Sequence, residues 1–131
     1  MVVKRQLAPI DLWDSSQFKF SQGVTSDCRS VIFIAGQTAM DSDGNIVGKG
    51  IPGEQVQQIF ENMKLVLEDA GATFENVVKL NAYFVNIDHL DEYSKIMSNY
   101  FPTGYPAQTV VEIKRLALPD LLMEVEAYAV L

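Results

Sequence analysis

Apolar and polar residues alternate along several short segments of the chain, a pattern typical of strands. Residues 18–24, FKFSQGV, alternate in this way, and residues 29–37 have an apolar core rich in β-branched side chains. Because only a short polar connection separates them, we predict a hairpin in which the second segment is a central strand. Three further strands are predicted over 76–85, 107–116 and 121–131.

Two other segments repeat apolar residues with a period near 3.6, which predicts amphipathic helices over 52–72 and 87–102. Gly71 stands where a left-handed C-cap belongs, Asp88 is the predicted N-cap of the second helix, and Pro102 ends it. The apolar stripe of the first helix consists of Val56, Ile59, Phe60, Met63, Val66, Leu67 and Ala70. The order is therefore β-β-α-β-α-β-β, an α+β fold in which both helices cover one face of a mixed sheet.

The other face of this sheet has no helix left to cover it. We expect Val110, Tyr83 and Tyr128 on that face, among charged side chains. Such a surface is typical of an interface between copies of one chain. No repeat or shift in composition divides the sequence, so we predict one domain over residues 1–131.

The formal net charge is −7, which disfavours non-specific binding to nucleic acid because phosphate backbones are repelled. The first residues contain no apolar run of signal-peptide length, and no segment is long enough for a membrane helix. With Cys28 as the only cysteine, an intramolecular disulfide is excluded. We therefore expect a cytoplasmic protein that binds neither nucleic acid nor membranes.

Few side chains point to chemistry by their spacing alone. The segment DSDGN resembles the opening of a calcium loop but lacks the required glycine and glutamate further on, so we interpret it as a turn. His89 is the only histidine, which argues against a catalytic triad or a histidine-rich metal site, and Cys28 is interpreted as an inert thiol. Glu124 and Glu126 share a strand face, where a carboxylate beside a pocket could act as a general base but a solvated charge is commoner.

Longer segments occur together in a recognisable order. They are FSQGV, FIAGQTAMDSDGNIVG, the run from Asn62 to Tyr93, YFPTGYPAQTVVEIKRL and MEVEAYAV. Together they resemble the RidA/YjgF family, also known as the L-PSP endoribonuclease group. The resemblance implies a chorismate-mutase-like fold and a homotrimer with clefts for a small-molecule ligand between subunits. It also implies hydrolysis of reactive enamines or imines without a metal or organic cofactor.

The resemblance assigns roles to five residues. Glu124 matches the glutamate that orients the attacking water, while Gln108, Phe20, Val110 and Ser94 match positions around the ligand. Gln108 stands where imine deaminases have an arginine that binds the substrate carboxylate, and Phe20 stands where many members have tyrosine. Val110 would present its backbone N–H, and Ser94 stands where asparagine is common. Loss of the bidentate guanidinium–carboxylate pair costs on the order of 2–5 kcal/mol of binding for an anionic imino acid.

Arg115 aligns with a second arginine of the family, but its predicted strand face differs from that of Gln108, so we do not expect it to replace the missing charge. We therefore predict a cofactor-independent hydrolase that acts on an enamine, an imine or a related neutral small molecule. The alternative is a non-catalytic trimer that binds a metabolite or a partner protein. Ribonuclease activity follows only from the older family name, and the acidic charge and single histidine disfavour it.

Overall fold

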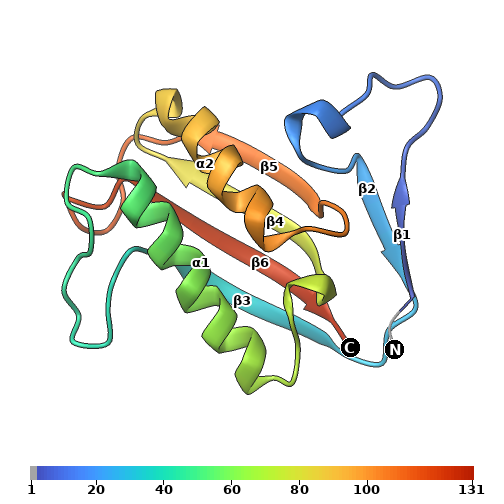
Figure 1. Ribbon diagram of the computed structural model, residues 1–131, viewed down its shortest axis with the longest axis horizontal. Coiled ribbons are helices and arrows are strands. Elements are labelled where there is room, and N and C mark those ends of the chain that lie inside the picture. Colours follow the sequence, from blue (N-terminus) through green and yellow to red (C-terminus); the bar gives the residue numbers. More distant parts are fainter. Residues whose placement is uncertain (1–2) are drawn as a thin grey trace.

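The computed structural model describes residues 3–131, which form a four-stranded mixed sheet with two α-helices on one face (Figure 1). A separate two-stranded sheet lies at the side of this layer. The strands are β1 (Lys4–Leu7), β2 (Gly23–Ser26), β3 (Val31–Gln37), β4 (Val77–Phe84), β5 (Ala107–Glu112) and β6 (Met123–Val130). The helices are α1 (Pro52–Asp69) and α2 (Leu90–Met97), with short 3₁₀ helices η1 (Ser16–Phe18), η2 (Phe74–Asn76), η3 (Ile87–His89) and η4 (Ser98–Tyr100). The predicted α+β fold is confirmed.

The strand order of the larger sheet is β3-β6-β4-β5. Strands β4 and β5 are parallel, whereas β6 is antiparallel to both of its neighbours. Parallel strands cannot be joined by a tight turn and need a crossover connection. Helix α2 lies in that connection, which fixes it over the β4–β5 half of the sheet (Figure 1).

Helix α1 buries the apolar stripe that its sequence predicts. Its buried side chains are Gln55, Val56, Ile59, Phe60, Met63 and Leu67. Val66, at the edge of the stripe, is 37% exposed, so its predicted burial is wrong. Gly71 follows the helix with φ of 72°, the predicted left-handed conformation that glycine adopts without strain.

The core lies between these helices and one face of the sheet. Strand β4 contributes Leu80, Ala82 and Phe84, and β6 contributes alternate residues from Met123 to Ala129. Tyr93 of α2 is fully buried against Phe84, with ring centroids 5.0 Å apart. Alternate residues of one strand point to one face, so the intervening side chains of β4 and β6 lie on the open face.

The predicted hairpin of 18–24 with 29–37 is wrong. Strand β2 pairs with β1, which the sequence pattern did not predict, while β3 pairs with β6 and forms an edge of the larger sheet rather than its centre. Residues 18–20 belong to η1 and the turn after it. A short connection favours a local hairpin, but β3 lies instead beside the buried alternate residues of β6, and hydrophobic pattern selects register and partner.

Segment boundaries also differ from the predictions. The helix expected over 87–102 consists of η3, α2 and η4, and Asn86 rather than Asp88 caps its start by accepting a hydrogen bond from the Asp88 N–H. Strand β5 ends at Glu112 and β6 begins at Met123. No helix in residues 3–131 combines the length and the apolar character that a membrane span requires.

The open face of the sheet carries large apolar side chains. Phe33 is 77% exposed and Tyr128 is 38% exposed, and their rings meet edge to face at 5.6 Å. Tyr83 also lies there as predicted, next to Glu124 in the register of β4 and β6. The expected position of Val110 on this face is wrong: Val110 aligns with buried Ala82 and packs against the core. Each face of β5 mixes apolar and polar residues, with Val110 on one face and Val111 on the other, so alternation alone could not show which face is buried.

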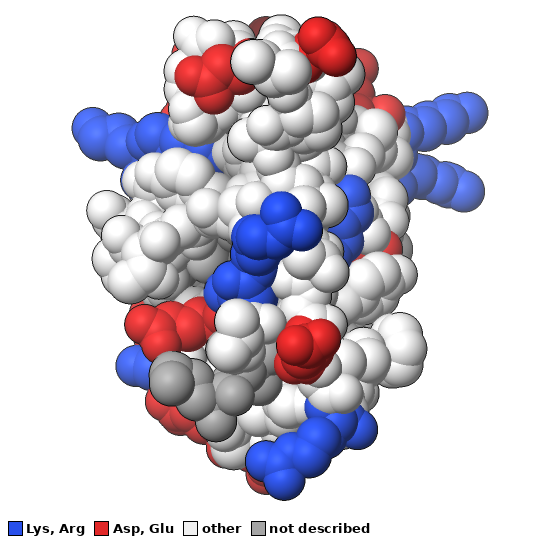
Figure 2. Space-filling model, turned by 90° about the vertical axis from the view of Figure 1, so that its right-hand side faces the viewer, with Lys and Arg blue, Asp and Glu red and all other residues white. Residues whose placement is uncertain are grey.

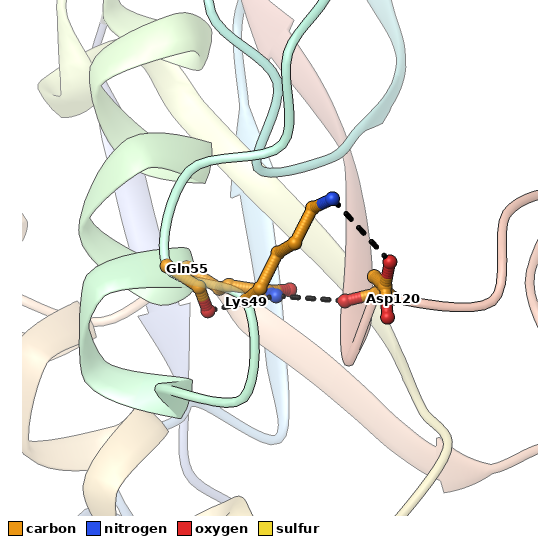
Figure 3. A network of polar contacts seen from close by, with 4 residues as sticks. Lys49, Gln55 and Asp120 are labelled. Carbon is orange, nitrogen blue, oxygen red and sulfur yellow. Dashed lines mark hydrogen bonds and ion pairs between the residues drawn. The ribbon is translucent and has the colours of Figure 1, made fainter.

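A buried glutamine joins the loop before α1 to the loop before β6 (Figure 3). The Gln55 side-chain amide donates to the carbonyl oxygens of Gly48 and Asp120, at 3.1 and 2.9 Å, and its oxygen accepts from the Leu122 N–H at 2.9 Å. Lys49 and Asp120 form an exposed ion pair at 3.7 Å beside it. These contacts fix the chain just before Glu124 enters β6.

Candidate functional site

A cavity of about 470 Å³ lies among the η1 segment, the first turn of α2 and strand β5. It is lined by Trp13, Gln17, Phe18, Lys19, Phe20, Leu90, Asp91, Ser94, Gln108 and Val110. Four of the five residues that the sequence proposed, Phe20, Ser94, Gln108 and Val110, therefore lie around one cavity. Glu124 is not among its lining residues.

Aromatic side chains form one wall of the cavity. Trp13 meets Phe18 and Phe20 edge to face, with centroids 5.4 and 5.8 Å apart. Trp13 and Phe18 remain 58% and 56% exposed in the single chain. Our sequence interpretation missed both, because it assigned Phe18 to a strand and Trp13 to no element. Three aromatic residues within the segment WDSSQFKF were the available signal.

Polar contacts fold the η1 segment into its shape. Asp14 accepts hydrogen bonds from the Ser16 N–H and hydroxyl, at 2.9 and 2.6 Å, and these bonds lower the pKa of its carboxyl group. The buried Ser15 hydroxyl donates to the Phe20 carbonyl at 2.9 Å. Lys19 adopts a left-handed conformation with φ of 62°, and its N–H donates to the Ser16 carbonyl. The chain thereby reverses direction and turns Phe20 toward β5.

Ser21 attaches this segment to β5. Its N–H donates to the Pro106 carbonyl at 3.0 Å, and its hydroxyl donates to the Tyr105 carbonyl at 2.6 Å. Ser21 also forms a parallel bridge with Ala107. Phe20 and Gln108 are the sequence neighbours of these bridged residues, so they reach the same cavity although they lie 88 positions apart in the chain.

A buried tyrosine fixes the Gln108 side chain. The Tyr93 hydroxyl donates to Gln108 Oε1 at 2.6 Å. Because burial strongly raises the pKa of Tyr93, its hydroxyl keeps the proton and acts as the donor. The amide oxygen of Gln108 is therefore occupied, and its Nε2 remains as a hydrogen-bond donor for the cavity.

Glu124 lies on the opposite face of the sheet from this cavity. It aligns with Tyr83 on the open face, whereas Gln108 aligns with buried Leu80 on the helix-covered face. Its side chain lies over Gly36, where an added β-carbon would overlap the carboxylate. One chain therefore does not bring Glu124 and Gln108 together.

The two glutamates of β6 differ in their partners. Glu126 accepts hydrogen bonds from the Asn81 amide at 3.0 Å and the Tyr83 hydroxyl at 2.8 Å, and the latter bond raises the pKa of Tyr83. Within residues 3–131, the Glu124 carboxylate takes part in no hydrogen bond or ion pair. Glu124 is thus the carboxylate that is available to a ligand or water.

The remaining candidates lie elsewhere. Arg115 follows β5 in a loop and lines a separate hollow with Leu116 and Pro119. Cys28 is exposed in the connection between β2 and β3. On the side of the molecule that carries β1 and β2, lysine and arginine side chains are separated by acidic and uncharged surface (Figure 2). In the described part of the chain, no group of three or more His, Cys, Asp or Glu side chains could hold a metal ion.

Comparison with known proteins gives a consistent family. The sequence profile described as Endoribonuclease L-PSP matches residues 15–131. A RutC family protein of Pyrococcus abyssi is 38% identical over 98 residues, which are 75% of this chain and 76% of that protein. The human 2-iminobutanoate/2-iminopropanoate deaminase is 33% identical over 112 residues, 85% of this chain and 79% of that protein.

A solved structure shares the fold over nearly the full length. The Rid family protein YyfB of Yersinia pestis, a protein of unknown function, is similar with a TM-score of 0.92 and 35% identity, and the match covers 98% of both chains. These matches agree with the family resemblance that the segments from FSQGV to MEVEAYAV indicated. The chain therefore belongs to the L-PSP family of RidA, YjgF and RutC proteins.

Proposed function

We propose that this protein hydrolyses the carbon–nitrogen bond of a small enamine or imine, without a cofactor, in clefts between copies of the chain. The observation that carries the proposal is the contrast between the two glutamates of β6. Glu126 is held by Asn81 and Tyr83, whereas Glu124 has a free carboxylate over Gly36. The deaminase name of the human relative supports the same reaction class.

In this reaction, Glu124 takes a proton from water while the water oxygen forms a bond to the imine carbon. The nitrogen accepts a proton, which gives a carbinolamine. The second proton of the attacking water then moves from the new hydroxyl group to the nitrogen while the carbon–nitrogen bond breaks and the carbonyl forms, so the products are a carbonyl compound and ammonia. Gln108 Nε2 donates to a polar group of the substrate, and the aromatic wall excludes water from the rest of the cavity. Each step uses only water and protons.

Because Glu124 and the cavity lie on opposite faces of one sheet, the reaction requires a second copy. We propose a homotrimer in which the open face of one subunit lies against the cavity of the next. The exposed Phe33 and Tyr128 support this arrangement, since apolar side chains of this size are typical of buried interfaces.

The test is to compare Glu124→Gln with Glu126→Gln. An amino-acid oxidase generates imines in the assay, and a trapping reagent reports the imine that survives. We expect Glu124→Gln to lower the hydrolysis rate by about 10²–10⁴-fold, the usual contribution of a general base. Glu126→Gln keeps most of the rate, because Glu126 is already engaged by its two neighbours. Equal rates in wild type and Glu124→Gln would reject the role of Glu124.

A second candidate function is ligand binding without catalysis. The preformed aromatic wall and the fixed Gln108 amide favour it, since both suit a stable ligand as well as a reacting one. Saturable binding without product formation, across a panel of imines, amides and carbamates, would support this candidate over hydrolysis.

A further inference from the structure

The open face of the sheet holds a tyrosine with two glutamates as neighbours. In the register of β4 and β6, Tyr83 lies directly opposite Glu124, and Asn81 lies directly opposite Glu126. The β-carbons of directly opposed residues are roughly 5 Å apart, and diagonal neighbours are farther from each other. The Tyr83 hydroxyl nevertheless donates to its diagonal neighbour, Glu126 Oε1, at 2.8 Å. This hydroxyl therefore bypasses the carboxylate that we propose as the general base.

The two carboxylates extend toward opposite sides of β6, which lies between β3 and β4 (Figure 1). Glu124 extends over Gly36 of β3, which has no side chain to block it. Glu126 extends toward β4, where the Asn81 amide donates to Glu126 Oε1 at 3.0 Å. The Tyr83 hydroxyl thus finds its acceptor on the β4 side, and the Glu124 carboxylate lies on the β3 side.

The partner of the Tyr83 hydroxyl matters for the chemistry of Glu124. The bond to Glu126 raises the pKa of Tyr83, so the hydroxyl keeps its proton and remains a donor. A hydroxyl that donates to a carboxylate stabilises the charged form and makes the carboxylate a weaker base. A weaker base takes a proton from water more slowly. A bond from Tyr83 to Glu124 would therefore slow the proposed reaction.

Few other titratable groups face this pair. On the four strands of the larger sheet, the open face also carries Tyr128 and Lys79, which lie opposite each other. Glu126 separates both of them from Glu124 in the register. Tyr83 is thus the titratable donor nearest to Glu124 in this sheet.

We propose that Asn81 and Glu126 are positioning residues that hold the Tyr83 hydroxyl away from Glu124 and so leave the general base free. Asn81 fixes the Glu126 carboxylate on the β4 side, and Glu126 binds the hydroxyl. This inference rests on the proposed function, because Glu124 acts as a base only if the reaction takes place. It assigns to both residues an effect on the base that they exert through Tyr83.

The test compares Glu126→Leu with a double variant that also carries Tyr83→Phe. In the single variant the hydroxyl loses its acceptor and turns to Glu124, its directly opposed neighbour. We expect kcat/KM for imine hydrolysis to fall about three- to tenfold and the acid limb of its pH profile to move about one pH unit lower, because the new hydrogen bond favours the carboxylate. In the double variant no hydroxyl is left, and both values return to those of wild type. Both variants carry the same change at position 126, so an effect of that change on folding or assembly is common to them.

Two single variants serve as controls. Glu126→Gln keeps the wild-type profile, because its amide oxygen still accepts from Tyr83 and Asn81. Tyr83→Phe alone also keeps it, because it has no hydroxyl to reach Glu124. An unchanged profile for Glu126→Leu, or a loss that Tyr83→Phe does not reverse, would overturn the proposal.

A titration without turnover separates this proposal from the proposed function. Carbon-13 NMR follows the Glu124 carboxyl carbon, which is assigned by the loss of its titrating signal in Glu124→Gln. We expect its midpoint to lie at lower pH in Glu126→Leu than in wild type and to return in the double variant. This pattern in a protein that hydrolyses no imine would reject the proposed function and leave the placement of the Tyr83 hydroxyl intact. A midpoint that does not move in Glu126→Leu would overturn that placement.

Discussion

Gly36 and Glu124 lie so close together that each determines what the other position tolerates. The glycine of the AGQ segment, Gly36, does not have a positive φ. A glycine is needed here because it has no side chain, and not because of its backbone freedom. Its hydrogen atoms leave space for the Glu124 carboxylate on the open face. Residue 36 is therefore a positioning residue for the proposed base.

Replacing this glycine tests the arrangement. We expect Gly36→Ala to displace the Glu124 carboxylate and to lower the hydrolysis rate by about 10²-fold, as a shift of roughly 1 Å does. It also lowers the free energy of unfolding by about 1–3 kcal/mol, the usual cost of overpacking. Kinetics and urea denaturation measure the two effects. In a Glu124→Ala background the stability cost disappears, and an equal cost in both backgrounds would show that Glu124 is not the group displaced.

Among the elements, the loops that enter α1 and β6 are joined by one buried side chain. Gln55 uses both its donor and its acceptor on the backbones of two loops, whereas Lys49 and Asp120 meet only at the surface (Figure 3). Buried hydrogen bonds and exposed ion pairs contribute very different amounts to stability. The loop that leads into β6 is held by the first kind of contact, through Asp120 and Leu122.

The two contacts can be compared directly by mutation. We expect Gln55→Leu to lower the free energy of unfolding by about 2–4 kcal/mol, because it removes the hydrogen-bond partner of the Leu122 N–H and of the Asp120 carbonyl. Lys49→Met changes it by less than about 1 kcal/mol, because both charges of that pair are more than half exposed. Thermal or urea unfolding of both variants measures the two changes in the free energy of unfolding. A larger loss for Lys49→Met than for Gln55→Leu would contradict this assignment.

For the whole molecule, the proposed reaction depends on the open sheet face. A monomer has Glu124 on one face and the cavity on the other. Phe33, the most exposed large side chain of that face, is well suited to reporting whether copies associate through it.

We expect Phe33→Asp to separate the subunits, since it would place a charge in an apolar interface. Light scattering then shows a lower mass, and imine hydrolysis is lost although the cavity of each chain remains. Leu65→Asp is the matched control, because Leu65 is 65% exposed on α1 and away from the sheet face. An unchanged mass for Phe33→Asp would place the interface elsewhere, and a monomeric wild type would remove the shared site.

Local patterns predicted the elements that depend on local energetics. The α1 stripe, its left-handed Gly71 and the turn around Gly44 follow from side-chain periodicity and from backbone preferences within a few residues. The pairing of β3 with β6 does not follow from such local preferences, because the two strands lie about 90 positions apart in the chain. A strand whose two faces both mix apolar and polar residues, as in β5, also leaves the buried face undetermined.

The sequence by itself determined the fold class, the two helices, the family and four of the residues that line the cavity, since these depend on periodicity and on segments that can be compared one by one. Only the tertiary structure decided which groups share a space. It brought Lys19 to the cavity of Gln108, fixed the Gln108 amide through Tyr93, and separated Glu124 from both by the thickness of the sheet. Charges and hydrogen bonds act over a few ångströms in space, and the order of residues along the chain does not give the distances between their side chains.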